Sequence, residues 1–339
     1  MSSANPFGLS KVKNIIAVSS CKGGVGKSTV AAGFARALSK KGLKVGLLDA
    51  DIHGPSLPTL FNLHSPRVLM NEFKMAVPVE AEGMKLMSFG FLLGDAPAVM
   101  RGPIIANYIQ QLLFKTEWSE LDYLIIDMPP GTGDVQLTIT QSIRLTGAVI
   151  VTTRQTLSLV DVARGILMFE KVKVPILGIV ENMAFFVCDS CDKKHYIFGD
   201  GQSVEKRFGV KTLLEIPIIP SLALEEYMNK GADVLLKAIE NQGKANDNLP
   251  QVTFDAQSIR LKFNDGKEKI LDNRTVRLAC QCAVCVNEFT GKKVLNPATV
   301  RVDIAPKEIT SLGNYAIGIS WNDNHSSGIF PYSLLEQLS

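Results

Sequence analysis

The sequence of 339 residues has little net charge and no long uncharged apolar run. Its 36 Lys and Arg residues against 33 Asp and Glu leave a formal net charge of +3, which gives no electrostatic reason to expect nucleic acid. The most apolar region, residues 166–186, is interrupted by Glu170, Lys171, Lys173 and Glu181. No segment therefore reaches the roughly 18 uncharged residues of a membrane-spanning helix. We expect neither nucleic acid nor a membrane among the partners.

The first ten residues contain neither an apolar core nor an Arg-rich amphipathic stretch. They do not look like a secretory or organelle-targeting signal, so the expected location is the cytoplasm. The sequence also has no internal repeat and no low-complexity tract. At roughly 150 residues per domain, its length predicts about two domains.

Short apolar runs alternate with helix-length amphipathic segments from residue 14 to about residue 241. This pattern is typical of βα units around a parallel sheet, and runs nearly continuous in Val, Ile and Leu suit strands covered on both faces. The expected strands are Asn14–Ser19, Val45–Asp49, Lys85–Phe89, Tyr123–Asp127, Ala148–Thr152, Ile176–Glu181 and Leu213–Ile216. The predicted fold class is α/β, with a mostly parallel sheet flanked by helices.

The pattern changes after residue 241. Residues 242–250 are polar and turn-forming, so we interpret them as a linker between a domain of residues 1–241 and a second domain of residues 251–339. In the second domain, Ile259 and Leu261 alternate with polar residues, which indicates strands. This C-terminal domain is predicted to be small and mostly β.

A glycine-rich segment with two lysines follows the first expected strand and precedes an amphipathic helical pattern. Strand, loop and helix in this order form a P-loop, whose backbone N–H groups bind phosphate at a helix N-terminus. Lys27 would reach the β- and γ-phosphates of ATP, and Ser28 would bind Mg²⁺. The predicted nucleotide-binding residues of this segment are Gly23, Gly24, Val25, Gly26, Lys27, Ser28 and Thr29.

Acidic residues at two strand ends complete the predicted nucleotide site. Asp49 and Asp51 lie two residues apart, and therefore on one side of the chain. Asp127 ends an apolar strand in the manner of a Walker B aspartate, which would hold Mg²⁺. Residues 128–134 would then form the loop that responds to the γ-phosphate. A single acidic strand end can be only a solvated edge, but its combination with a P-loop favours the functional interpretation.

The six cysteines are closely spaced, apart from Cys21, which we expect to be a small packed residue. Close spacing without a signal peptide favours metal binding or redox chemistry over structural disulfides. Cys188 and Cys191 provide two thiols, half of a four-ligand site that a two-fold dimer would complete. A buried structural pair and a thioredoxin-like redox couple are the alternatives.

A second cysteine group lies in the C-terminal domain. Its three thiols need a fourth ligand to close a metal site, and a histidine about forty residues later could supply it. The predicted Cys₃His zinc ligands are Cys280, Cys282, Cys285 and His325, with a second iron-sulfur site as the alternative. The remaining histidines, His53, His64 and His195, are expected on the surface or in loops.

Several strings together resemble a known family. The extra lysine of residues 21–29 resembles the deviant Walker A of the MinD and ParA class of P-loop NTPases. Residues 49–56, 127–134 and 178–199 are similar to the Mrp/ApbC family of iron-sulfur cluster carrier ATPases, and this resemblance covers residues 10–245.

The resemblance implies an ATP-hydrolysing homodimer. In such a dimer Lys22 reaches the partner's phosphates, Asp51 orients the attacking water with Asp49 in support, and Asn182 contacts the adenine. The resemblance further implies a 4Fe-4S cluster held between two Cys188–Cys191 pairs, received from cluster donors and passed to apo-proteins.

The C-terminal domain resembles the small zinc-binding domain at the N-terminus of γ-butyrobetaine hydroxylase. By resemblance the same module ends a chloroplast Mrp-type scaffold, in the same domain order. Many family members begin with a further small domain or a ferredoxin-like cysteine set, and we expect this chain to have neither. The alternatives are a MinD/ParA-like positioning or partition ATPase with purely structural cysteines, and a metal-sensing protein whose zinc domain is the active part.

Overall fold

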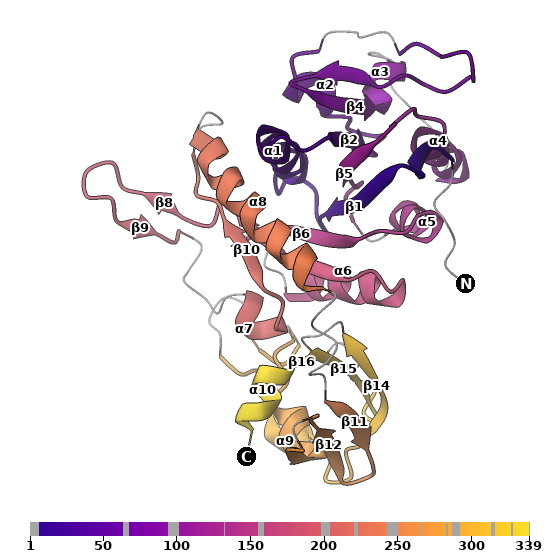
Figure 1. Cartoon of the computed structure of the whole chain (residues 1–339). Coiled ribbons are helices and arrows are strands. Elements are labelled where there is room, and N and C mark those ends of the chain that lie inside the picture. Colours follow the sequence, from indigo (N-terminus) through magenta and orange to yellow (C-terminus); the bar gives the residue numbers. More distant parts are fainter. Residues whose placement is uncertain are drawn as a thin grey trace.

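The computed structural model describes residues 7–63, 68–93, 102–131, 133–154, 159–197, 204–219, 223–242, 250–264, 266–282, 284–286, 292–312, 316–326 and 328–338. His64, Thr132 and most of the expected linker lie outside the described residues. The described part forms an N-terminal α/β domain and a smaller β-rich C-terminal domain (Figure 1). Within it, no helix has both the length and the apolar character needed to cross a membrane.

Among the described residues, an eight-stranded sheet forms the centre of the N-terminal domain, in the order β10-β7-β6-β1-β5-β2-β4-β3. The strands run parallel, apart from β3, which pairs antiparallel with β4 at one edge. The bounds are β1 Val12–Ser19, β2 Val45–Asp49, β3 Val79–Ala81, β4 Met84–Ser88, β5 Leu121–Asp127, β6 Gly147–Thr153, β7 Ile176–Asn182 and β10 Thr212–Glu215. All seven expected strands are present within two residues of their predicted bounds, which confirms the α/β fold class.

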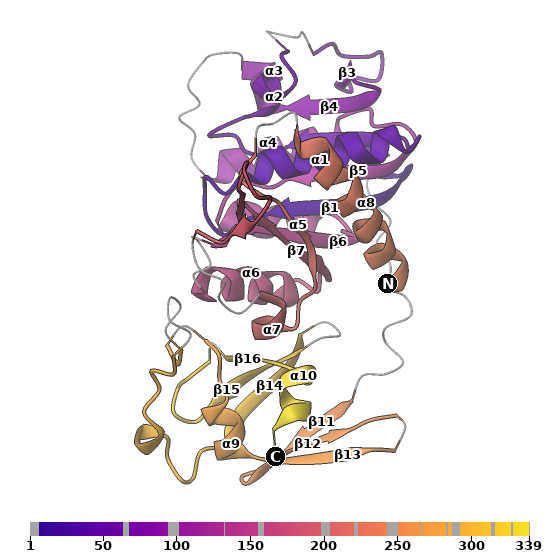
Figure 2. The same ribbon diagram turned by 90° about the vertical axis from the view of Figure 1, so that its left-hand side faces the viewer.

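Helices cover both faces of the sheet (Figure 2). Their bounds are η1 Phe7–Leu9, α1 Lys27–Lys40, α2 Leu57–Leu60, α3 Phe89–Leu93, α4 Gly102–Phe114, α5 Asp134–Ser142, α6 Leu159–Lys171, α7 Val204–Phe208 and α8 Leu224–Asn241. Helices α1 and α8 pack on one face, and α4, α5 and α6 on the other.

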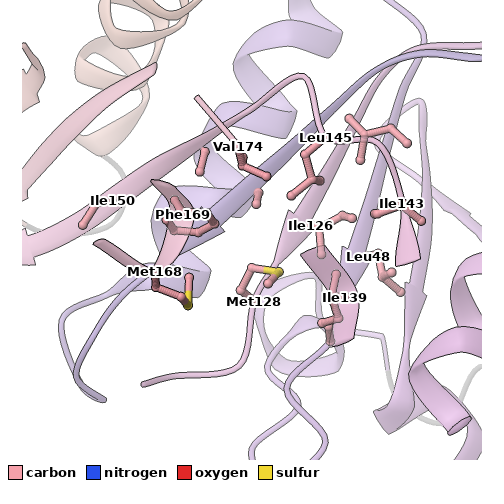
Figure 3. Close-up of a cluster of buried hydrophobic side chains, with 14 of the residues drawn as sticks. Leu48, Ile126, Met128, Ile139, Ile143, Leu145, Ile150, Met168, Phe169 and Val174 are labelled. Atoms are coloured by element: carbon pink, nitrogen blue, oxygen red, sulfur yellow. The ribbon is translucent and has the colours of Figure 1, made fainter. Parts of the chain in front are cut away.

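Alternating residues of the central strands supply both cores. In β1, Ile15 and Ala17 belong to the buried cluster under α4, α5 and α6, whereas Ile16 and Val18 face α1. Figure 3 shows part of the first cluster, in which strand residues such as Ile126 lie among side chains of the helical layer. The period of two explains why these strands appear in the sequence as unbroken apolar runs.

The C-terminal domain contains two three-stranded antiparallel sheets in its described residues. Their strands are β11 Gln251–Phe254, β12 Ser258–Lys262 and β13 Glu268–Asp272, then β14 Pro306–Leu312, β15 Ala316–Trp321 and β16 Gly328–Pro331. The short helices are α9 Asn273–Leu278, η5 Pro297–Thr299 and α10 Tyr332–Gln337. Helix α9 begins where the Asp272 carboxylate accepts a hydrogen bond from the Thr275 N–H. The prediction of a small, mostly β domain is confirmed.

The two domains share buried contacts. Strand β16 lies against α7, and β14 lies against α6. Ala316 and Ile329 of the C-terminal domain are buried in the same apolar cluster as Phe169 of α6 and Phe208 of α7. The C-terminal domain is therefore docked on the helical layer of the N-terminal domain.

Candidate functional site

The segment between β1 and α1 has the backbone of a phosphate-binding loop. Gly24 and Gly26 adopt left-handed conformations, with φ of 79° and 83°, and Gly26 is the N-cap of α1. A Cβ atom at Gly23 or Gly24 would meet no other atom within 4 Å. The loop therefore leaves open space beside its backbone, where phosphate oxygens fit.

Lys27 and Asp127 form a buried ion pair at the floor of this loop. The Lys27 ammonium contacts Oδ1 of Asp127, and the two side chains are 6% and 0% exposed. Burial raises the pKa of Asp127, while Lys27 and Ser28 act in the opposite direction. Among the described residues, Oδ2 of Asp127 has no hydrogen-bond partner. A buried carboxylate oxygen beside the Ser28 hydroxyl suits the oxygen donor set that Mg²⁺ prefers.

Asp49 anchors the loop that follows β2. Its carboxylate accepts hydrogen bonds from the Asp51 N–H at 3.1 Å, the Ser56 N–H at 2.8 Å and the Ser88 hydroxyl at 3.0 Å. Burial, with a smaller contribution from the neighbouring Asp127, raises the pKa of Asp49 to about 6. These hydrogen bonds tie Asp49 to the backbone of the loop that contains Asp51, and its supporting role in catalysis stays a prediction.

Asp51 faces an open cavity of about 420 Å³ between two loops. One wall is the loop of residues 51–54, where Asp51 accepts hydrogen bonds from the His53 and Gly54 N–H groups. The other wall contains Pro129, Pro130, Gly133, Val135 and Gln136. The predicted water-orienting carboxylate and the described part of the predicted γ-phosphate loop thus share one cavity.

Asn182 contacts the phosphate loop directly. Its side-chain amide donates to the Val25 carbonyl oxygen at 2.9 Å. A Cβ at Gly26 would lie only 2.2 Å from the same nitrogen atom. In this structure Asn182 therefore braces the loop, a contact that the sequence did not reveal; its predicted contact with adenine stays a prediction.

Lys22 and Cys21 differ in exposure. Lys22 is exposed at the mouth of the loop. The Cys21 thiol packs against Gly165 of α6, where a Cβ would approach it to 2.6 Å, and burial raises its pKa to about 12. Cys21 is thus a packed, protonated thiol, as expected, and Lys22 is free to extend from the surface.

Cys188 and Cys191 lie at the tip of a hairpin formed by β8 Phe186–Val187 and β9 Lys194–His195. The hairpin projects away from the sheet (Figure 1). Cys191 is exposed and Cys188 is half-buried. Backbone N–H groups, led by that of Ser190, lower the pKa of Cys188, and this favours a thiolate. The described chain therefore presents two accessible thiols here, and neither is part of a larger ligand group.

A cluster of aromatic and charged side chains supports the base of this hairpin. The rings of Phe185 and Tyr196 lie 5.6 Å apart, and the Arg154 guanidinium lies 4.3 Å from the centre of the Tyr196 ring. Arg154 also pairs with Glu181 and Glu215, both at 3.0 Å. Sequence reasoning gave no role to Arg154, which belongs to no motif, or to Tyr196, which lies within the string of residues 178–199 but has no recognisable ligand chemistry.

The four predicted ligands of the C-terminal domain come together. Their ligand atoms lie within 4.8 Å of one another, and the three cysteines are buried. The distances from Nε2 of His325 to the sulfur atoms of Cys280, Cys282 and Cys285 are 3.3, 3.5 and 4.0 Å. Contacts with the other two thiols and burial raise the pKa of Cys280 well above its ordinary value. So crowded a set of thiols can ionise together only around a cation.

Side chains outside this group hold it in place. Arg277 donates to the Cys285 sulfur at 3.4 Å and pairs with Asp323 at 3.0 Å. Asp323 in turn accepts a hydrogen bond from the His325 N–H. Such outer partners orient ligands and offset the charge of bound thiolates.

Comparison with known proteins identifies the N-terminal domain. Residues 11–253 match the family model described as "ParA: NUBPL iron-transfer P-loop NTPase". The chain belongs to this family. Residues 251–336 of this iron-transfer P-loop NTPase match a second family model, "Gamma-butyrobetaine hydroxylase-like, N-terminal".

Curated relatives of this iron-transfer P-loop NTPase have names that mention iron-sulfur clusters. "Fe-S cluster assembly factor HCF101, chloroplastic" of Arabidopsis thaliana is 46% identical over 354 residues, covering 98% of this chain. "Iron-sulfur cluster carrier protein" of Aquifex aeolicus is 51% identical over 229 residues, covering 66% of this chain. The chain spans 66% and 62% of the length of these two relatives.

A solved structure shares the fold of the P-loop domain. The nucleotide-binding protein of Archaeoglobus fulgidus, in complex with ADP, is 43% identical, with a TM-score of 0.57. The match covers 66% of this chain and 89% of that protein. The predicted resemblance to a P-loop NTPase of the cluster-carrier type is confirmed.

Proposed function

We propose that the protein is an ATP-hydrolysing carrier that holds a 4Fe-4S cluster between two copies of its Cys188–Cys191 hairpin and transfers it to apo-proteins. The observation that carries the proposal is the position of two features at one edge of the sheet. The P-loop follows β1 and the hairpin follows β7, and both strands are parallel, so both features leave from their carboxyl ends. Two copies that face each other across this edge would bring four thiols together.

In the proposed reaction, this chain's own residues bind and orient the nucleotide. Lys27 and the backbone of Gly23 to Gly26 hold the phosphates, and Ser28 with Asp127 holds the Mg²⁺ that screens their charge. Asp51, with its carboxylate in the loop cavity, orients the attacking water. Lys22, exposed in one copy, would stabilise the phosphates bound to the other copy.

The Cys₃His group of the C-terminal domain is proposed to bind zinc. Zinc with Zn–S near 2.3 Å and Zn–N near 2.05 Å places sulfur and nitrogen about 3.6 Å apart in a tetrahedron. The distances of 3.3 to 4.0 Å to His325 bracket that value. Four ligand atoms within 4.8 Å enclose one ion, whereas a four-iron cluster needs ligands on separate irons.

The proposal includes three further expectations. The two domains are divided at residues 242–250, donor proteins supply the cluster, and the protein is located in the cytoplasm. The name of the plant relative places that protein in the chloroplast, so fractionation of the source cell tests the location.

The deciding experiment is metal analysis after anaerobic reconstitution. Wild type is compared with the double variant Cys188→Ala, Cys191→Ala, and with Cys21→Ala as the matched control, because Cys21 is a half-buried thiol outside the hairpin. We expect about four iron and four sulfide per dimer, lost in the double variant and kept in the control. About one zinc per chain should remain in all three proteins. Iron that is absent from wild type, or indifferent to the hairpin cysteines, refutes the carrier and favours a partition-type ATPase.

A further inference from the structure

The cysteine hairpin has little support of its own. Strands β8 and β9 contain two residues each, and a two-stranded hairpin of this length is marginal in water. The position of its two thiols therefore depends on side chains at its base. There the ring of Phe185 is buried, Tyr196 lies against it edge to face, and the Lys194 ammonium lies 4.4 Å from its centre.

Arg154 joins that base to the sheet. It follows β6 directly, and its side chain is 9% exposed. Its guanidinium pairs with Glu181 of β7 and Glu215 of β10, and its face covers the Tyr196 ring at 4.3 Å. A planar guanidinium can bind carboxylates along its edge and stack on a ring with its face, whereas a lysine ammonium cannot do both. Arg154 thus connects three adjacent strands with the hairpin.

The next residue of β7 reaches the nucleotide loop. Asn182 holds the Val25 carbonyl oxygen and lies against Gly26, while Glu181 holds Arg154. Neighbouring side chains of a strand point to opposite faces, so β7 carries the loop contact on one side and the Arg154 contact on the other. Any shift of the loop backbone on phosphate binding therefore acts on Asn182, the chain neighbour of the residue that fixes Arg154.

We propose that Arg154 is a positioning residue through which nucleotide bound at the P-loop controls the position of the Cys188–Cys191 hairpin. The inference rests on the proposed function, because it names how ATP would govern that same thiol pair. Bound nucleotide fixes the backbone of Val25 and Gly26, and this moves the side chain of Asn182 that contacts them. The contacts among Glu181, Arg154 and Tyr196 then transmit the movement to the hairpin. Couplings between sites in proteins typically change affinity by about 5- to 150-fold.

The competing explanation is purely structural, since Arg154 also offsets the charge of two carboxylates. Under that explanation, replacing Arg154 lowers stability and leaves the response to nucleotide intact. Two variants separate the explanations. Tyr196→Leu removes the ring under Arg154 and keeps both ion pairs, whereas Tyr196→Phe keeps the ring and serves as the matched control. Arg154→Lys keeps the positive charge and loses the planar face.

The experiment uses the full chain reconstituted with its cluster, and measures the rate of iron release to a ferrous chelator with and without Mg·ATP. The ratio of the two rates reports how strongly the nucleotide acts on the cluster site. We expect a ratio of about fivefold or more in wild type and Tyr196→Phe, and a ratio near one in Tyr196→Leu and Arg154→Lys. Iron per chain should be equal in wild type and both Tyr196 variants. A wild-type ratio in Tyr196→Leu, or a ratio of one in wild type, overturns the inference.

A second readout needs no cluster, and it separates failure of the inference from failure of the proposed function. Alkylation of the Cys188–Cys191 peptide by iodoacetamide is followed by mass spectrometry, with and without Mg·ADP. Nucleotide should change the rate in wild type and Tyr196→Phe but not in Tyr196→Leu. If wild type binds no cluster, the carrier proposal fails, yet this comparison still decides whether Arg154 and Tyr196 connect the two sites.

Discussion

Two lysines five residues apart occupy opposite environments, and this contrast separates their functions. Lys27 is 6% exposed and paired with Asp127, so its removal would leave a buried carboxylate without its cation. Lys22 lies on the surface. Its proposed target is therefore the nucleotide of a second copy.

Lys22→Ala should leave folding and ADP binding unchanged and lower ATP hydrolysis by about 100-fold or more. Loss of an exposed side chain changes the free energy of unfolding by about 0.5 kcal/mol at most. Cationic groups supplied by a partner are worth at least the stated factor in phosphoryl transfer. Phosphate release, ADP titration and urea unfolding measure the three quantities.

Mixing two inactive variants tests whether Lys22 acts on the partner. Lys27→Ala lacks a working site but keeps Lys22, and Lys22→Ala keeps its site. Half of a random mixture would be mixed dimers with one complete site each, so about a quarter of the wild-type rate should return. A mixture as inactive as its components would contradict the assignment of Lys22.

The buried carboxylate of Asp49 predicts a specific pH dependence. Its pKa rises from 3.8 to about 6 on folding, so the folded state binds the proton more tightly than the unfolded state. The contribution of Asp49 to stability then falls as the pH rises from about 4 to about 6 and is constant above that range. The total loss is roughly 3 kcal/mol, from about 1.4 kcal/mol per pKa unit.

The test compares wild type with Asp49→Asn by urea unfolding at several pH values. Both carry Trp321→Phe, so that buried Trp118 alone reports on the N-terminal domain. The free energy of unfolding of Asp49→Asn minus that of wild type should rise by roughly 3 kcal/mol between pH 4 and pH 7. A difference that stays constant with pH would show that Asp49 does not titrate in this range.

The residues that carry motifs were predictable, and those that act through tertiary contacts were not. The P-loop, Asp127 and the Cys₃His ligands have fixed spacing because chemistry demands it, so the sequence revealed them. Arg154 meets Glu181 and Tyr196 only because β6, β7 and the hairpin are neighbours in the fold. No local sequence pattern predicts such a contact between distant residues.

At the scale of the element, the loop between β1 and α1 depends on two glycines for different reasons. Gly26 has a φ of 83°, and a Cβ there would strike Asn182 at 2.2 Å. Gly23 has open space around it and no such backbone constraint. One glycine serves the fold of the loop, and the other leaves room for ligand.

Gly26→Ala should therefore lower the free energy of unfolding by about 1–3 kcal/mol, as expected for strained backbone. Adding Asn182→Ala should recover part of that loss, because it removes the clash but not the left-handed φ; the coupling comes from a double-mutant cycle. Gly23→Ala should keep wild-type stability and weaken Mg·ADP binding by about tenfold or more, since its methyl group occupies the phosphate space. Equal stability of the two glycine variants would refute the different roles assigned to Gly26 and Gly23.

The regular elements of the N-terminal domain could be predicted because burial on both faces leaves a strong signal. The centres of strands β1, β5 and β6 are buried and apolar, and their bounds were found within two residues. Strand β3 and the β8–β9 hairpin are short and have no fully buried residue, so hydrophobic pattern does not mark them. The cysteine pair was recognised by its ligand chemistry, while its position on a projecting hairpin required the structure.

At the scale of the whole molecule, the metal group of the C-terminal domain lies behind the surface that docks on the N-terminal domain. A Cβ at Gly328, the first residue of β16, would lie 3.2 Å from the Cys280 sulfur. The next residue, Ile329, is buried in the core cluster that contains Phe208 of α7. The ligand His325 precedes β16 by three residues, so the metal group fixes the start of the docking strand.

Removing the metal should therefore loosen a helix of the other domain. Structural zinc contributes on the order of 10 kcal/mol to the folding of small domains, so chelation should release β16 and expose the surface of α7 that it covers. Hydrogen exchange of the full chain, followed by mass spectrometry before and after chelation, measures this effect. Protection should fall in β16 and in α7 and stay unchanged in α1, which packs on the opposite face of the sheet.

Cys282→Ser should reproduce the pattern without a chelator, and Cys188→Ser is the matched control because that thiol lies on the hairpin. If chelation affects the C-terminal domain alone, the metal stabilises that domain but does not hold the two domains together.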